Sequence, residues 1–262
     1  MGYAPVNGLR MYYEIHGPNG SDHPPLVLLH GALSATETSF GALLPALAKD
    51  RPVIAVEQQA HGRTADIDRP LRDVQMAADT AGLLDQLRIR RADLMGYHMG
   101  AGIAVQVAHS RPDLVRKLVL ISLVTQPEGF QEGVREALAL ITPDLLEGSP
   151  FAEEFARLAP DPTAWPRTVE RVKEWDAHFV PTPPEVLRGI QAPAMVVAGD
   201  ADIVRPEHTA ELYGLLGGEM ADRRGELPRS RMCVVPGASH ASVVARTDVL
   251  LPVIPPFLDA PV

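Results

Sequence analysis

The stretch DLMGYHMGAGIAVQVA, residues 93–108, predicts a strand, a tight turn and a helix in immediate succession. The apolar residues before Gly96 are typical of a buried strand, and those after Gly100 have the pattern of a helix. His98 stands between the two glycines, at the centre of the turn. Because turns that follow parallel strands gather at one edge of a sheet, where functional sites form, we expect His98 to belong to such a site.

Other apolar runs along the chain predict that this strand belongs to a mostly parallel sheet. Helical patterns over residues 76–89 and 102–110 separate several of the runs, and strand–helix alternation of this kind places helices on both faces of a parallel sheet. The continuous runs typical of buried parallel strands are PLVLLHG, RPVIAVE, RADLMGY, RKLVLIS, PAMVVAGD and RMCVVPG. Strict alternation near the N-terminus predicts an antiparallel strand at the sheet edge, one face of which is formed by Leu9, Met11, Tyr13 and Ile15.

Residues 125–187 interrupt this rhythm and predict a small helical cap over the edge that carries the site. The segment is rich in proline and contains two helical patterns, over residues 129–141 and 164–179, before the strand signal resumes. Residues 1–124 and 188–262 would then form the core domain. The alternative is an ordinary pair of crossover helices, but an insertion of this length favours a functional role.

Composition and charge exclude several classes of partner. Hydrophobic residues make up 46% of the 262 residues, which is enough for a packed core. The net charge is −9 and no basic cluster occurs, so we expect neither nucleic acid nor an anionic membrane as a partner. No apolar run is long enough to span a bilayer, and the N-terminus lacks a signal-peptide pattern. We therefore predict a soluble cytoplasmic protein of undetermined oligomeric state.

Three chemically active side chains follow buried strands in a characteristic order. His98 comes first, Asp202 lies in the segment GDAD, and His240 ends the segment GASH. The sequence HGAL, residues 30–33, follows the first of the buried strands. A turn residue, an acid and a histidine in this order form the arrangement in which a nucleophile, its supporting acid and a general base meet.

Five motifs together make the chain resemble the α/β-hydrolase superfamily over nearly its whole length. They are HGAL, EQQAHGRTADIDRP, GYHMG, GDADIVRPEH and PGASH, which are similar to the oxyanion loop, the RGHGxS segment, the GxSxG nucleophile elbow, the acid loop and the histidine loop. The resemblance is greatest to small capped hydrolases of the esterase and lactonase kind. It implies the α/β-hydrolase fold, a mostly parallel doubly wound sheet with a small helical cap.

The resemblance also implies roles for individual residues. Asp202 would orient His240 and stabilise its imidazolium, with Asp200 as the rival acid. The backbone N–H groups of Ala32 and Met99 would form the oxyanion hole. His30 and His61 also lie in motifs, but in this superfamily histidines at those positions are mostly structural. No cofactor is implied, and the expected partner is a small-molecule substrate.

His98 departs from the superfamily pattern, which has serine, or less often aspartate or cysteine, at this position. Histidine tolerates the positive φ of such a turn better than most residues. The helix dipole and a protonated His240 would both disfavour a charge on the ring, so we expect a neutral imidazole at pH 7. A neutral imidazole is the form that acts as a base or a nucleophile.

Four interpretations of His98 stay open at this point. His98 attacks an ester or lactone carbonyl directly, with His240 activating water afterwards. Alternatively, His98 and His240 act as an acid–base pair in a lyase, cyclase, epoxide-opening or cofactor-free reaction. The ring could instead block hydrolysis and leave a ligand-binding protein. Finally, the histidine could be an engineered replacement of serine.

The substrate would lie between the sheet edge and the cap. Aromatic residues favour apolar pockets, so the expected wall residues are Phe40, Trp165, Trp175 and Phe179, although packing within the cap explains each of them equally well. A metal site is disfavoured, because Asp202 should reach the far nitrogen of His240 and not the shared cavity.

Overall fold

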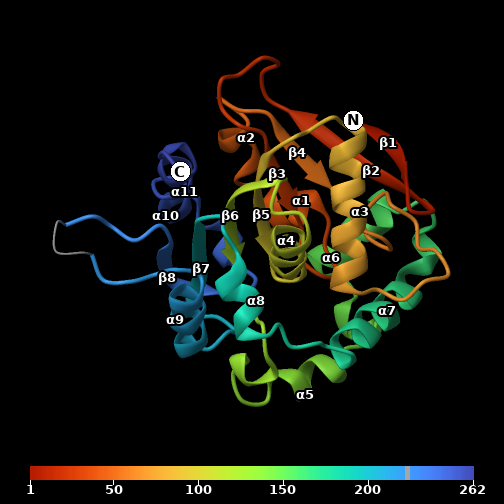
Figure 1. Cartoon of the computed structure of the whole chain (residues 1–262). Helices are drawn as coiled ribbons and strands as arrows, with labels where there is room; N and C mark the ends of the chain where they lie inside the picture. Colours follow the sequence, from red (N-terminus) through yellow and green to blue (C-terminus); the bar gives the residue numbers. More distant parts are fainter. Residues whose placement is uncertain (222–224) are drawn as a thin grey trace.

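The structure, a computed structural model, describes residues 1–221 and 225–262 and is built on an eight-stranded sheet (Figure 1). The strand order is β1-β2-β4-β3-β5-β6-β7-β8, and β3 to β8 run parallel. The α/β-hydrolase architecture predicted from the sequence is confirmed. The strands are β1 (Gly2–Val6), β2 (Leu9–His16), β3 (Leu26–Leu29), β4 (Val53–Val56), β5 (Ala92–Tyr97), β6 (Val115–Ile121), β7 (Ala194–Ala201) and β8 (Arg231–Ser239).

The N-terminal edge of the sheet differs from the prediction by one strand. The alternating segment forms β2, which is antiparallel to β4 as expected, but β1 pairs with its other side and is the true edge. Asn7 and Gly8 join the two strands with φ values of 47° and 86°. Two consecutive positive φ values are what a two-residue hairpin loop needs, and Asn-Gly is the sequence that supplies them most readily.

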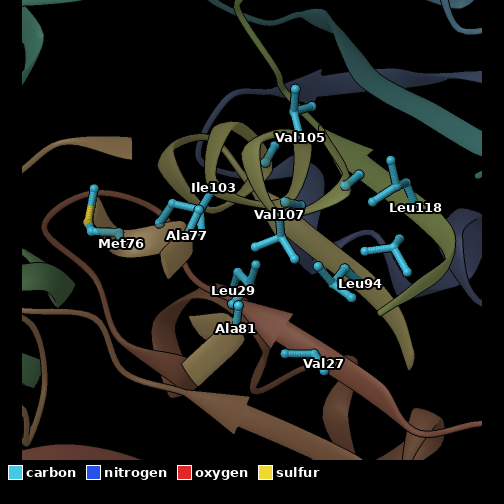
Figure 2. Packing of buried hydrophobic residues seen from close by; sticks show 14 of the residues in the cluster. Val27, Leu29, Met76, Ala77, Ala81, Leu94, Ile103, Val105, Val107 and Leu118 are labelled. Carbon is cyan, nitrogen blue, oxygen red and sulfur yellow. The ribbon is translucent and has the colours of Figure 1, made fainter. Parts of the chain in front are cut away.

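Helices cover both faces of the sheet, because its central strands are apolar on both sides. In β3, Val27 and Leu29 join the core beneath α3 and α4, whereas Leu26 and Leu28 join the core beneath α10 and α11. Figure 2 shows the first of these two cores. The covering helices are α1 (Thr36–Phe40), α2 (Leu44–Leu47), α3 (Asp73–Gln86), α4 (Met99–Ser110), α8 (Pro184–Gly189), α9 (Pro206–Leu215), α10 (Thr247–Leu250) and α11 (Ile254–Asp259).

The inserted segment, residues 125–187, contributes helices of which two, α5 and α7, lie away from the strands along the lower side of the view in Figure 1. It contains α5 (Val134–Ala139), α6 (Pro150–Leu158) and α7 (Trp165–Ala177), together with short 3₁₀ turns. The predicted C-terminal boundary of this segment falls inside α8, whose Leu187 is buried in the core. Since α8 packs against α4 and α9, its residues belong structurally to the core.

Two kinds of feature are absent from residues 1–221 and 225–262. No helix in this range has both the length and the hydropathy needed to cross a bilayer. The same residues include no cluster of three His, Cys, Asp or Glu side chains that could bind a metal ion.

Candidate active site

His98 occupies a sharp, strained turn between β5 and α4. Its φ of 51° and ψ of −112° lie outside the regions that most L-residues adopt. The flanking glycines make the turn possible: a Cβ atom at Gly96 would lie 2.2 Å from the backbone oxygen of Gly100, and one at Gly100 would lie 1.9 Å from the oxygen of Leu29. The strand and helix therefore cross so closely that only glycine fits at these positions, and the turn projects the His98 side chain beyond the sheet edge.

Asp202 and His240 meet at the same edge, since each follows the end of its own strand. Nδ1 of His240 lies 2.8 Å from Oδ1 of Asp202. Burial opposes ionisation of Asp202, but the hydrogen bond and charge attraction to His240, with the Ser122 hydroxyl, hold the pKa of this carboxyl below its ordinary value. Asp200, the rival acid, instead accepts a hydrogen bond from the backbone N–H of Ala238 at 3.1 Å. The geometry thus favours Asp202 as the partner of His240.

The rings of His98 and His240 lie perpendicular to each other, with an interplanar angle of 86° and centroids 4.9 Å apart. No hydrogen bond joins the two rings within the described residues. Burial, and then the charge of a protonated His240, lower the pKa of His98 to about 3, although Asp202 acts in the opposite direction. His98 is therefore neutral at pH 7, as the sequence predicted.

Sequence reasoning missed two residues that hold this pair in place. The hydroxyl of Ser122 donates to Oδ2 of Asp202 at 2.5 Å, and the hydroxyl of Tyr97 donates to the backbone oxygen of His240 at 3.0 Å. Ser122 directly follows β6 and has a φ of 53°. The available signal was its position, since a polar residue that ends a buried parallel strand lies at the edge where sites form.

The loop after β3 brings Ala32 to the cavity beside His98. Leu33 has a positive φ of 60°, and its backbone N–H donates to Nε2 of His61 at 3.1 Å. In the described part of the chain, no hydrogen bond is donated by the backbone N–H of Ala32 or of Met99. Two free N–H groups, one in this loop and one at the first residue of α4, have the character that an oxyanion hole requires.

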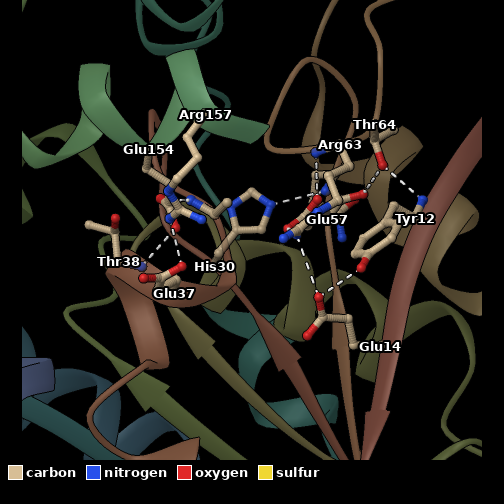
Figure 3. A network of polar contacts seen from close by, with 12 residues as sticks. Tyr12, Glu14, His30, Glu37, Thr38, Glu57, Arg63, Thr64, Glu154 and Arg157 are labelled. Carbon is tan, nitrogen blue, oxygen red and sulfur yellow. Dashed lines mark hydrogen bonds and ion pairs between the residues drawn. The ribbon is translucent and has the colours of Figure 1, made fainter. Parts of the chain in front are cut away.

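His30 and His61 support that loop from the interior. The N–H of Gln58 donates to Nε2 of His30 at 2.9 Å, and Nδ1 of His61 lies 2.8 Å from the oxygen of Gln59. Burial lowers the pKa of His30 to about 4, and burial with the nearby His30 lowers that of His61 to about 3. Figure 3 shows His30 within a larger polar network. Neither ring borders the main cavity, and their structural role stays a prediction from the motifs.

A cavity of about 200 Å³, here called the main cavity, opens in front of His98 and His240. Its lining is apolar apart from the histidines, Tyr97 and two charged residues of α7, Lys173 and Asp176. The apolar lining residues are Ala32, Leu33, Leu138, Ile141, Leu146, Phe151, Val169, Val172, Trp175 and Ile203. The sheet edge and the inserted segment both contribute to this wall, so a bound molecule would be enclosed between them.

Of the four aromatic residues expected to line the substrate site, only Trp175 borders the main cavity. Phe40 is buried in the core beneath α10 and α11 and does not border the main cavity. Trp165 packs against Phe155, with the ring planes tilted by 49°, and lines a separate surface groove. Phe179 contacts Phe130 and borders another groove. The expectations for these three residues are therefore corrected by their placement.

A strained turn residue after β5, an aspartate after β7 and a histidine after β8 define the α/β-hydrolase class of site. Comparison with known families agrees, because the model of the alpha/beta hydrolase family matches residues 26–251. The chain belongs to this family, which confirms the resemblance seen in the sequence.

Known relatives of the chain include several hydrolases. The chain is 28% identical over 254 residues to a putative carbamate hydrolase, RutD, of Pseudomonas savastanoi, covering 88% of this chain and 92% of that protein. It is 34% identical over 121 residues to pyrrolizixenacetamide deacetylase of Xenorhabdus hominickii, a match that covers 46% of this chain and only 44% of the deacetylase. The crystal structure of the enol-lactonase from Burkholderia xenovorans has a similar fold, with a TM-score of 0.74 at 24% identity over 98% of this chain and all of the lactonase chain.

Proposed function

We propose that this protein hydrolyses a carboxylic ester or lactone, with His98 as the nucleophile. The observation that carries the proposal is the placement of His98 on the strained turn, facing the same cavity as the Asp202–His240 pair. Relatives named as a deacetylase, a carbamate hydrolase and an enol-lactonase support cleavage of an acyl bond in general. The apolar lining of the main cavity supports a small, largely apolar acyl group as the bound part of the substrate.

The first half of the proposed reaction transfers the acyl group to His98. The unprotonated ring nitrogen attacks the carbonyl carbon, and the C=O electron pair moves to the oxygen, which the N–H groups of Ala32 and Met99 stabilise. The proton on the other nitrogen of His98 passes to His240, directly or through a water molecule. The C–O bond then breaks, and the leaving alkoxide takes this proton from His240 as the alcohol departs.

The second half releases the acid. His240, neutral again, removes a proton from water, and the resulting hydroxide attacks the acyl-imidazole carbonyl. The C–N bond to His98 breaks, and the proton held by His240 returns to the ring of His98. Asp202 stabilises the imidazolium of His240 in both halves, because its carboxylate lies 2.8 Å from Nδ1.

A second candidate function is acid–base chemistry without a covalent intermediate. The specific observation in its favour is that both imidazoles border the main cavity without a hydrogen bond between them. Each ring can therefore exchange a proton with a bound substrate independently.

The decisive experiment compares ester turnover by the unmodified protein, His98→Ser and His98→Ala on a panel of short-chain aryl esters. We expect turnover by the unmodified protein, loss of turnover in His98→Ala, and an acyl mass shift on the peptide containing His98 after acid quench. Equal turnover by His98→Ala would contradict the nucleophile proposal. Turnover by His98→Ser alone would show an intact hydrolase site whose histidine serves acid–base chemistry or blocks hydrolysis.

A further inference from the structure

Trp175 of α7 reaches from the inserted segment to the turn that carries His98. The planes of its indole and of the His98 ring meet at 86°, with centroids 5.7 Å apart, and the indole forms part of the main cavity wall. Its Nε1–H donates to Oδ1 of Asp73 at 2.7 Å. Trp175 is nearly buried, with 8% of its surface exposed. The indole is therefore held at both ends, by packing against His98 and by a hydrogen bond to the core.

Asp73, the acceptor of that hydrogen bond, is the first residue of α3 and lies closely against α4. A Cβ atom at Gly102 would lie 3.0 Å from Oδ2 of Asp73, so the carboxylate fits there because residue 102 is glycine. Burial raises the pKa of Asp73, although the hydrogen bond from Trp175 opposes this change. The anchor for the indole is thus a carboxylate enclosed between two core helices and the inserted segment.

A second hollow borders Asp73. This outer groove has a volume of about 270 Å³ and is lined mostly by the end of the inserted segment. Asp73, Phe179 and Val186 are among its lining residues, whereas Trp175 lines the main cavity. Since Asp73 and Trp175 are hydrogen-bonded to each other, the pair forms one wall with the main cavity on its inner side and the outer groove on its outer side.

We propose that Trp175, anchored by Asp73, is the partition that limits the length of the acyl chain accepted by the main cavity. This inference rests on the proposed function, since it concerns the acyl part of an ester substrate. Without the indole, the main cavity would connect to the outer groove, whose Phe179 and Val186 offer apolar contacts to a longer chain. Each added methylene that leaves water is worth up to about four-fold in binding. Asp73 acts as a positioning residue, because it touches Trp175 and not the substrate.

The test is an acyl-chain-length profile of kcat/KM for aryl esters from four to ten carbons. The quantity compared is the ratio of kcat/KM for a longer ester to kcat/KM for the four-carbon ester. For an ester three methylenes longer than the longest one that the wild type accepts well, we expect Trp175→Ala to raise this ratio by on the order of 50-fold. Trp175→Phe, which keeps a smaller ring and loses the N–H, should shift the profile less. Asp73→Ala should also shift the preference toward longer chains. Asp73→Asn should keep the wild-type preference, because the carbonyl oxygen of asparagine can accept the hydrogen bond from the indole.

Trp165→Ala is the matched control, since it removes the other indole of α7, which lines a different groove. It should keep the wild-type order of chain lengths. A uniform loss of activity at every chain length in both Trp175 variants would overturn the partition proposal. Calorimetric binding of straight-chain carboxylic acids of the same lengths separates this proposal from the function itself: a shift toward longer acids in Trp175→Ala, with no ester turnover by any variant, would support the partition and contradict ester hydrolysis.

Discussion

Glu154→Gln is expected to destabilise the fold at the junction between the inserted segment and the loop after β3. Glu154 of α6 is buried, with 5% of its surface exposed. Its two carboxylate oxygens accept the backbone N–H groups of Ala35 at 2.7 Å and Thr38 at 2.9 Å (Figure 3). These are N–H groups at the start of α1, which has no side-chain cap of its own. A helix of the inserted segment thus supplies the acceptors that a core helix lacks.

The magnitude follows from what glutamine can replace. The carbonyl oxygen of glutamine can accept a hydrogen bond from one of the two N–H groups. Its amide NH₂ group is itself a donor, so the second N–H group would lose its acceptor. A hydrogen bond to a charged group contributes about 1.5–3 kcal/mol, and a buried donor left without an acceptor costs about 1–3 kcal/mol. We therefore expect a loss of about 2–4 kcal/mol in the free energy of unfolding, or roughly 4–8 °C in Tm for a chain of this size.

Urea unfolding followed by far-ultraviolet circular dichroism, together with thermal unfolding, would measure this loss. Glu153→Gln is the matched control, because the neighbouring Glu153 is exposed and only its backbone N–H, which donates to the oxygen of Ser149, forms a hydrogen bond within the described residues. Its effect should stay within about 0.5 kcal/mol. A Glu154→Gln variant as stable as the Glu153→Gln variant would refute the idea that this carboxylate fastens the inserted segment to the core.

The remaining predictions concern protonation and a buried cation. Because the folded-state pKa of His98 is lowered to about 3, the unfolded chain binds more protons below pH 6.5 and stability falls on acidification. Between pH 8 and pH 5, the wild type should therefore lose about 2 kcal/mol more in free energy of unfolding than His98→Ala does. An NMR titration of His98 with a midpoint above pH 5 would contradict this prediction. Lys117 is buried and donates to the oxygens of Phe257 and Ala260 at 2.6 and 2.5 Å at the end of α11. Lys117→Met should cost roughly 2–4 kcal/mol in urea unfolding, and a change below 0.5 kcal/mol would show that water replaces the ammonium.

The parallel sheet could be predicted from the sequence because its strands are apolar on both faces. A short, continuous apolar run such as PLVLLHG is typical of a strand that is buried on both faces. All six of the predicted runs form strands in the structure. The edge strand β1 was missed because GYAPV is short, contains a proline and is stabilised by pairing with β2. Such a segment becomes a strand through its hairpin partner, and its own composition does not reveal it.

The order of His98, Asp202 and His240 could be predicted because each directly follows a strand, so topology alone brings the three side chains together. The aromatic residues that line the main cavity could not be predicted in this way, because the direction in which a side chain on a helix points depends on how the helix packs. Trp165 and Trp175 lie ten positions apart on α7, which separates their directions by roughly 80° around the helix axis at 3.6 residues per turn. Of the two, Trp175 borders the main cavity and Trp165 does not, and the sequence contained no sign of which one would.

The turn at His98 explains how an imidazole fits a position where the superfamily pattern has a hydroxyl. The close crossing of strand and helix depends on Gly96 and Gly100, and the side chain between them points away from that crossing toward His240 and Trp175. The larger imidazole ring therefore extends to the main cavity and does not clash with the strand or the helix. A serine at this position needs a base to remove its proton before attack, whereas a neutral imidazole already has a free electron pair. Because the attack by His98 needs no base beforehand, in the proposed mechanism His240 matters most when water releases the acyl group.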